Sequence, residues 1–68
     1  MDENKEYRGL DAIAIRLDRS RDTIRKFLDP GYCKKMGMTI LPAVKVGREW
    51  WITERSIIVW LERNSLSA

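Results

Sequence analysis

The 68-residue sequence contains no histidine and a single cysteine, Cys33. One cysteine cannot close an internal disulfide, and a zinc site needs several sulfur or nitrogen ligands that carboxylates alone rarely replace. Without histidine, a nucleophilic triad lacks its usual general base. A glycine-rich phosphate loop of the G-x-x-x-x-G-K-[ST] type is missing as well. We therefore expect a protein that is not an enzyme and that uses no metal, cofactor or small-molecule ligand.

The sequence also lacks an apolar run long enough to span a membrane. Its start, "MDENKEY", is acidic and polar, unlike a signal peptide. Hydrophobic content of 44% and charged content of 34% are typical of a folded domain, and a chain of this length forms one domain. We expect a cytoplasmic protein with an acidic N-terminal arm over residues 1–7, a folded domain over 8–64 and a frayed tail over 65–68.

Basic residues are unevenly distributed, although the formal net charge is only +3. They outnumber acidic residues between positions 16 and 26, and four more basic residues precede Glu49: Lys34, Lys35, Lys45 and Arg48. Clustered positive charge on a small domain is typical of a nucleic-acid-binding surface. The alternative is an ordinary solvated face, and charge alone does not decide between the two.

Apolar residues recur with helical spacing between residues 8 and 18. The stripe consists of Leu10, Ile13, Ala14 and Leu17. Asp18 follows, and aspartate tolerates a left-handed turn position, while Ser20 is a favourable N-cap. A second helix follows Ser20 and stops before Pro30, because the residue preceding proline is disfavoured in helical geometry. Residues 31–42 are predicted to form a loop.

Two short β-prone segments flank Gly47 and predict a hairpin. We expect Val44 and Val46 to share a face with Trp50 and Ile52, which leaves Lys45 and Trp51 on the opposite face. Thr53 can N-cap a last helix that buries Ile57, Trp60 and Leu61. The predicted fold is therefore mainly α with a two-stranded β-hairpin wing, the winged helix-turn-helix plan.

Two segments carry a resemblance to a known family. "LDAIAIRLDRSRDTIRKFL" resembles the helix-turn-helix of small prophage excisionases and MerR-like regulators, and "LPAVKVGREWWITERSIIVWL" resembles their wing and closing helix. Ala14, Asp18 and Ile24 match the small, turn and β-branched positions of the family. The family usually has glycine at the turn, so Asp18 is a departure from its pattern.

The resemblance implies that the second helix enters the major groove of double-stranded DNA. Arg25 is the predicted reader of guanine, whereas Asp22 could accept from cytosine and Thr23 could contact a thymine methyl group. Phosphate contacts are predicted for Arg19, Arg21 and Lys26. The alternative is a solvated helix face with ion pairs such as Asp22 with Arg25.

In the resembling families the wing follows the adjacent minor groove, which implies DNA contacts for Lys45, Gly47 and Arg48. Trp50 occupies the family's usual tryptophan position and is expected in the core with Trp60. Trp51 is expected to pack over the Lys45 stem, with a contact to DNA or a partner as the alternative. Ile58 and Val59 are candidates for a partner surface.

The sequence thus predicts a sequence-specific double-stranded DNA-binding protein. The resemblance, and an end of the chain soon after the closing helix, favour an excisionase-like recombination directionality factor, associated with the nucleoid through DNA. Its partners would be an integrase or recombinase, or neighbouring copies of itself on DNA. A small phage or plasmid transcriptional regulator is the first alternative, and a protein–protein adaptor with a winged-helix fold is the second.

Overall fold

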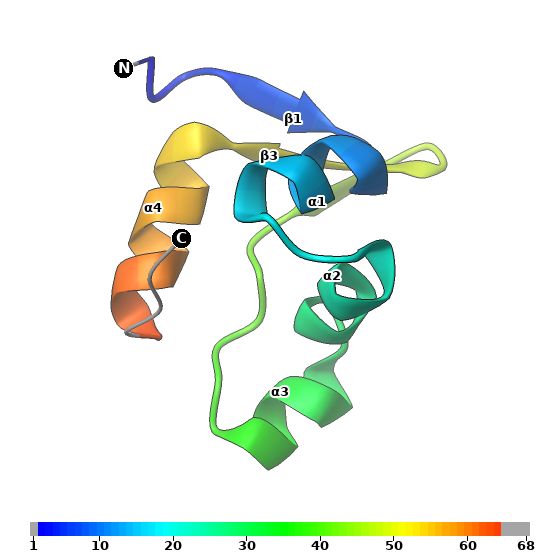
Figure 1. Cartoon of the computed structure of the whole chain (residues 1–68), viewed down its shortest axis with the longest axis vertical. Coiled ribbons are helices and arrows are strands. Elements are labelled where there is room, and N and C mark those ends of the chain that lie inside the picture. Colours follow the sequence, from blue (N-terminus) through cyan, green and yellow to red (C-terminus); the bar gives the residue numbers. More distant parts are fainter. Residues whose placement is uncertain (1, 65–68) are drawn as a thin grey trace.

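The computed structural model describes residues 2–64, so the predicted tail over 65–68 lies outside the described residues. The described residues form a compact domain of four helices and a three-stranded antiparallel sheet (Figure 1). The elements in chain order are β1 (Glu6–Arg8), α1 (Leu10–Leu17), α2 (Arg21–Phe27), α3 (Pro30–Met36), β2 (Val44–Val46), β3 (Glu49–Thr53) and α4 (Glu54–Arg63).

The connection between α1 and α2 has the predicted chemistry. Asp18 ends α1 in a left-handed conformation, with φ 54° and ψ 48°, and its N–H donates to carbonyl groups in the last turn of the helix. Ser20 then caps α2, because its Oγ accepts a hydrogen bond from the Thr23 N–H at 3.2 Å. Asp18 thus occupies the turn without the glycine that the resembling family usually has there, and the chain reverses within a few residues.

The prediction of a loop over residues 31–42 is wrong for its first half, which forms α3. Asp29 accepts a hydrogen bond from the Gly31 N–H at 3.0 Å and acts as an N-cap. Pro30 is tolerated in the first turn because the N–H that it lacks would have no intrahelical partner there. Gly37 closes the helix with φ 70°. The same proline therefore separates α2 from α3 and begins the second of them.

The prediction of a two-stranded sheet is also corrected, because residues 6–8 add a third strand. β1 pairs antiparallel with β3, with Tyr7 opposite Ile52 and Arg8 opposite Trp51, so the strand order is β1-β3-β2. The first helix consequently begins at Leu10, after Gly9, whose N–H donates to the Trp50 carbonyl at 2.7 Å. Part of the predicted acidic arm is thus an edge strand.

The hairpin between β2 and β3 has a register that differs by one residue from the expected one. Val46 pairs with Glu49, so only Gly47 and Arg48 form the turn. Lys45 is then opposite Trp50, and Val44 is opposite Trp51. Because paired residues in a sheet point to the same face, the prediction that Lys45 and Trp51 share a face is wrong. The observed turn is one residue shorter than the expected one, so every β2 side chain lies on the face of the sheet opposite to the predicted one.

The core lies where the helices meet one face of the sheet. Its buried members are Ile13, Ala14, Leu17, Ile24, Phe27, Leu41, Ile52, Ile57 and Trp60. The predicted N-cap of α4 is present, since Thr53 Oγ1 accepts from the Ser56 N–H. Trp60 stacks at a tilt against Phe27, with ring centroids 5.1 Å apart, and donates from Nε1 to the Thr39 carbonyl at 2.8 Å. Trp50 is only partly buried at the edge of this core.

Figure 1 shows α4 on one side of the molecule and α2 with α3 on the other. The segment 37–43 passes between them on its way to β2, and Leu41 from this segment is fully enclosed in the core. No helix among the described residues has the length and apolar character needed to cross a membrane.

A buried ionic network, not predicted from the sequence, joins three elements. Glu54 at the start of α4 is only 2% exposed and accepts two hydrogen bonds from the Arg16 guanidinium on α1, each of 2.6 Å. Tyr7 Oη of β1 donates to the same carboxylate at 2.8 Å. The hydrogen bonds from Arg16 lower the pKa of Glu54 from 4.5 to about 2. The network therefore ties the N-terminal strand to α1 and α4 while Glu54 remains ionised.

Candidate nucleic-acid interface

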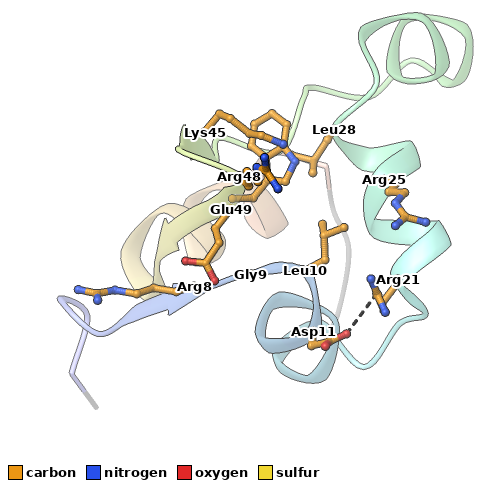
Figure 2. Close-up of a pocket in the computed structure, with 11 residues that line it drawn as sticks. Arg8, Gly9, Leu10, Asp11, Arg21, Arg25, Leu28, Lys45, Arg48 and Glu49 are labelled. Atoms are coloured by element: carbon orange, nitrogen blue, oxygen red, sulfur yellow. Dashed lines mark ion pairs between the residues drawn. The ribbon is translucent and has the colours of Figure 1, made fainter.

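An open groove of about 670 Å³ lies between α2 and the hairpin of β2 and β3 (Figure 2). We call it the basic groove, because its charged lining is mostly cationic. The cations are Arg8, Arg21, Arg25, Lys45 and Arg48, and the acids are Asp11 and Glu49. Leu10, Leu28 and Trp50 supply apolar lining. Cationic side chains from α2 and the hairpin thus converge on one concave surface, whereas the Arg8 side chain extends from β1 away from it (Figure 2).

The α2 wall of the groove carries Arg21 and Arg25, which are one helical turn apart. Arg21 Nε lies 3.2 Å from Asp11 Oδ1, and Arg25 Nη1 lies 3.2 Å from Asp22 Oδ1. Both pairs are exposed, with side-chain exposure of 58% and 77% in the first. Exposed pairs of this kind contribute only about 0–1 kcal/mol, so a phosphate could displace either carboxylate at little cost. The ion pair between Asp22 and Arg25 is the one that the solvated-face alternative predicted.

The hairpin wall carries Lys45 and Arg48. Lys45 Nζ lies 4.9 Å from the centroid of the Trp50 ring, within the range of a cation–π contact. Gly47 adopts φ 61° at the tip, and a Cβ placed there would meet no atom within 4 Å. The glycine is therefore required by backbone conformation and leaves the tip sterically open. Figure 2 shows Lys45 and Arg48 on the side of the groove opposite Arg21 and Arg25.

Glu49 is an acidic side chain within this cationic lining. Its Oε1 accepts a hydrogen bond from Trp51 Nε1 at 3.3 Å. A Cβ at Gly9 would lie 3.6 Å from Oε2, so the carboxylate extends from β3 toward the start of α1. Glu49 consequently reduces the positive potential of the groove where β1 meets the hairpin.

The remaining predicted DNA contacts on α2 and its preceding turn lie outside the basic groove. Arg19 donates to the Asp18 carbonyl at 3.1 Å, and Thr23 Oγ1 is 2.9 Å from Ser20 Oγ. Lys26 lies over the Tyr32 ring of α3, 5.8 Å from its centroid. A smaller hollow of about 360 Å³ brings Asp22 next to Arg21 and Arg25 at the start of α2. The groove thus gathers Arg21, Arg25, Lys45 and Arg48 from the predicted set.

The structure gives Trp51 a neighbour other than the predicted one. Its ring does not pack over Lys45, because the hairpin register places Lys45 on the other face. Instead the Arg8 guanidinium lies over it, with Cζ 4.2 Å from the ring centroid. Trp51 is half-buried, as is Ile58, whereas Val59 is 41% exposed. None of these three residues lines the basic groove.

Sequence reasoning missed the strand β1, which passes the edge of the groove at Arg8, because it placed this position at the start of a helix. The signal for a strand was short: Tyr7, a β-prone residue, stands between charged side chains and just before Gly9. Its partner strand is more than forty residues away, so no local pattern reveals the pairing. Arg16 and Glu54 were missed as a pair for the same reason.

Among residues 2–64, no three histidine, cysteine, aspartate or glutamate side chains cluster in a way that could hold a metal ion. Cys33 is buried, its thiol donates to the Phe27 carbonyl at 3.3 Å, and desolvation raises its pKa. Its surroundings are those of a structural cysteine.

Comparisons with protein-family models, with curated proteins and with solved structures return no match for this chain.

Proposed function

We propose that the protein is a winged helix-turn-helix module that binds double-stranded DNA with sequence preference. The observation that supports this most strongly is the basic groove, in which cations from α2 face cations from the hairpin across an open concave surface. In the proposed complex α2 enters a major groove and the hairpin follows the neighbouring minor groove. The sugar–phosphate strand that separates the two DNA grooves would lie in the basic groove.

The residues divide into two roles in this proposal. Arg25 reads a base edge, because its guanidinium can pair with two acceptors of guanine once Asp22 is displaced. Arg21, Lys45 and Arg48 contact phosphates and set the register without reading sequence. With these three contacts, log affinity falls against log salt with a slope of about −3.

Among biological roles, we propose an excisionase-like directionality factor in the cytoplasm, acting on attachment-site DNA together with an integrase. A small transcriptional regulator would use the same surface. Footprinting of DNA that flanks the gene distinguishes the two, since an attachment site indicates recombination and a promoter indicates regulation. An adaptor that kept the fold but binds only protein would show no salt-dependent affinity for duplex DNA.

The test is a selection of preferred duplexes from a random library, followed by affinity measurements over a salt series. Arg25→Ala is expected to lose discrimination worth about 1–3 kcal/mol at one base position. Arg48→Ala is expected to weaken binding to all duplexes alike and to reduce the salt slope by about 1.

Lys35→Ala is the matched control, because Lys35 is an exposed cation on α3 outside the groove. Equal losses for Lys35→Ala and Arg48→Ala would show that binding follows total charge and not the basic groove. A wild-type affinity that does not change with salt would refute the proposed function.

A further inference from the structure

A second groove, of about 260 Å³, lies between α4 and the segment 37–43. Its apolar lining comes from Ile40, Pro42, Val59 and the edge of Trp60. Ile40 and Val59, which both line the groove, are 45% and 41% exposed, which is high for aliphatic side chains. Arg55 and Arg63 also line the groove. We call this surface the apolar groove.

The apolar groove and the basic groove share no lining residue. A ligand in one therefore does not touch the side chains that form the other. The apolar groove also lacks the concentration of cations expected of a phosphate site, because only its two arginines are charged. Its chemistry suits an apolar side chain that is accompanied by a carboxylate.

A side chain of that description is present elsewhere on the same molecule. Ile15, near the C-terminal end of α1, is 81% exposed, the highest value among the large exposed hydrophobic residues. Asp11 and Asp18 are its i−4 and i+3 neighbours and lie beside it on the same helix face. Asp11 is paired with Arg21, whereas Asp18 belongs to no ion pair among the described residues. Arg19 also lies at this surface and keeps its charge, with its guanidinium donating to the Asp18 carbonyl.

We propose that Ile15 of one copy inserts into the apolar groove of a second copy, with Asp18 next to Arg55 or Arg63. An isoleucine side chain is small enough for a groove of about 260 Å³. Because the two contacting surfaces differ, the contact is heterologous: each copy contributes a protruding residue to one neighbour and can offer its groove to another. The surface around Ile15 includes Asp11 and Arg21, which also line the basic groove. The self-association is therefore tested in the absence of DNA.

Two variants, used singly and as a mixture, test this contact in the absence of DNA. Ile15→Asp removes the protruding residue, and Val59→Glu places a charge in the groove; both positions are exposed enough to keep the fold intact. Sedimentation velocity over a micromolar to millimolar range is expected to show concentration-dependent growth in mass for the wild type. Each variant alone is expected to remain monomeric.

The mixture of the two variants gives the decisive result. The Val59→Glu copy keeps Ile15, and the Ile15→Asp copy keeps an intact groove. One contact can therefore form between them, and a 1:1 heterodimer is expected with the affinity that a single contact has between two wild-type copies. Met36→Glu is the control, since Met36 is exposed on α3 and lines neither surface, and it should associate like the wild type.

A wild-type chain that stays monomeric at millimolar concentration in low salt would overturn the proposal. So would a mixture that shows no heterodimer, because association would then involve other surfaces. Loss of association in Met36→Glu would point to a general effect of charge. Circular dichroism checks that each variant is as folded as the wild type. Unfolding is then excluded as the cause of any loss of self-association.

Discussion

At the residue scale, Glu54 is a charged side chain that the described structure buries almost completely. Its carboxylate is almost fully buried and is held by Arg16 and Tyr7. Removing one member of such a group leaves the others with unsatisfied hydrogen-bonding capacity. The network thus stabilises the attachment of β1 to α1 and α4.

Glu54→Gln is expected to lower the free energy of unfolding by about 1–3 kcal/mol at neutral pH, the cost of a buried group that loses its partner. In a domain of this size, each kcal/mol corresponds to roughly 4–8 °C in Tm. Urea unfolding monitored by tryptophan fluorescence measures the change. Glu62→Gln is the control, because Glu62 is exposed on the same helix, and an equal loss in that variant would contradict the role of the network.

The same network predicts a pH dependence with a defined sign. The pKa of Glu54 is lower in the folded chain, about 2, than its ordinary value of 4.5. Its contribution is therefore fully present above pH 4.5 and is lost as the pH falls toward 2, because the unfolded chain then binds the proton more readily. The wild type should lose its advantage over Glu54→Gln across this window. A difference between the two that stays constant from pH 6 to pH 2.5 would contradict the assignment.

Under the proposed function, Glu49 is expected to affect DNA binding more than folding. Glu49→Gln keeps an oxygen that can accept from Trp51 Nε1 but removes the negative charge from the basic groove. We expect DNA affinity to rise by about 1 kcal/mol at low salt, the size of one charge–charge interaction near 4 Å in water. Fluorescence anisotropy with a labelled duplex measures it. Unchanged affinity at low salt would indicate that the DNA backbone does not enter the groove near β3.

At the element scale, the local signals in the sequence were sufficient for α1, α2 and α4. Asp18, Ser20 and Thr53 each occupy the turn or cap position that their side chains predict. These features depend on residues within one turn of each other, and a sequence shows them directly. Pro30 was harder, because a proline that ends one helix can also begin the next, and only the Asp29 cap reveals the second role.

The sheet was less predictable than the helices. β1 is recognisable only through its partner β3, which lies at the far end of the chain. The register of β2 depended on whether the turn includes Glu49, and the composition of the tip does not decide this. The groove depends on the second detail, because the observed register turns Lys45 toward it. The sequence predicted four of its cations but not the surface on which they meet.

At the scale of the whole molecule, two surfaces with different chemistry lie on separate residues. The basic groove collects cations for a polyanion, and the apolar groove is matched by Ile15 and Asp18 of another copy. The apolar groove would stay accessible on a chain bound to DNA in the proposed way, whereas the Ile15 surface shares Asp11 and Arg21 with the basic groove. If both proposals hold, neighbouring chains on one duplex could contact each other.

The length of α2 gives a reason why several chains would bind side by side on one duplex. Its 7 residues make a rod of about 10 Å. At about 3.4 Å per base pair, this rod passes only about three steps of a duplex. A sequence of three base pairs recurs by chance throughout any genome. One chain alone would therefore recognise too few base pairs to select a unique site. Selection of one site would have to come from the number and spacing of several such sequences, each bound by the α2 helix of a different chain.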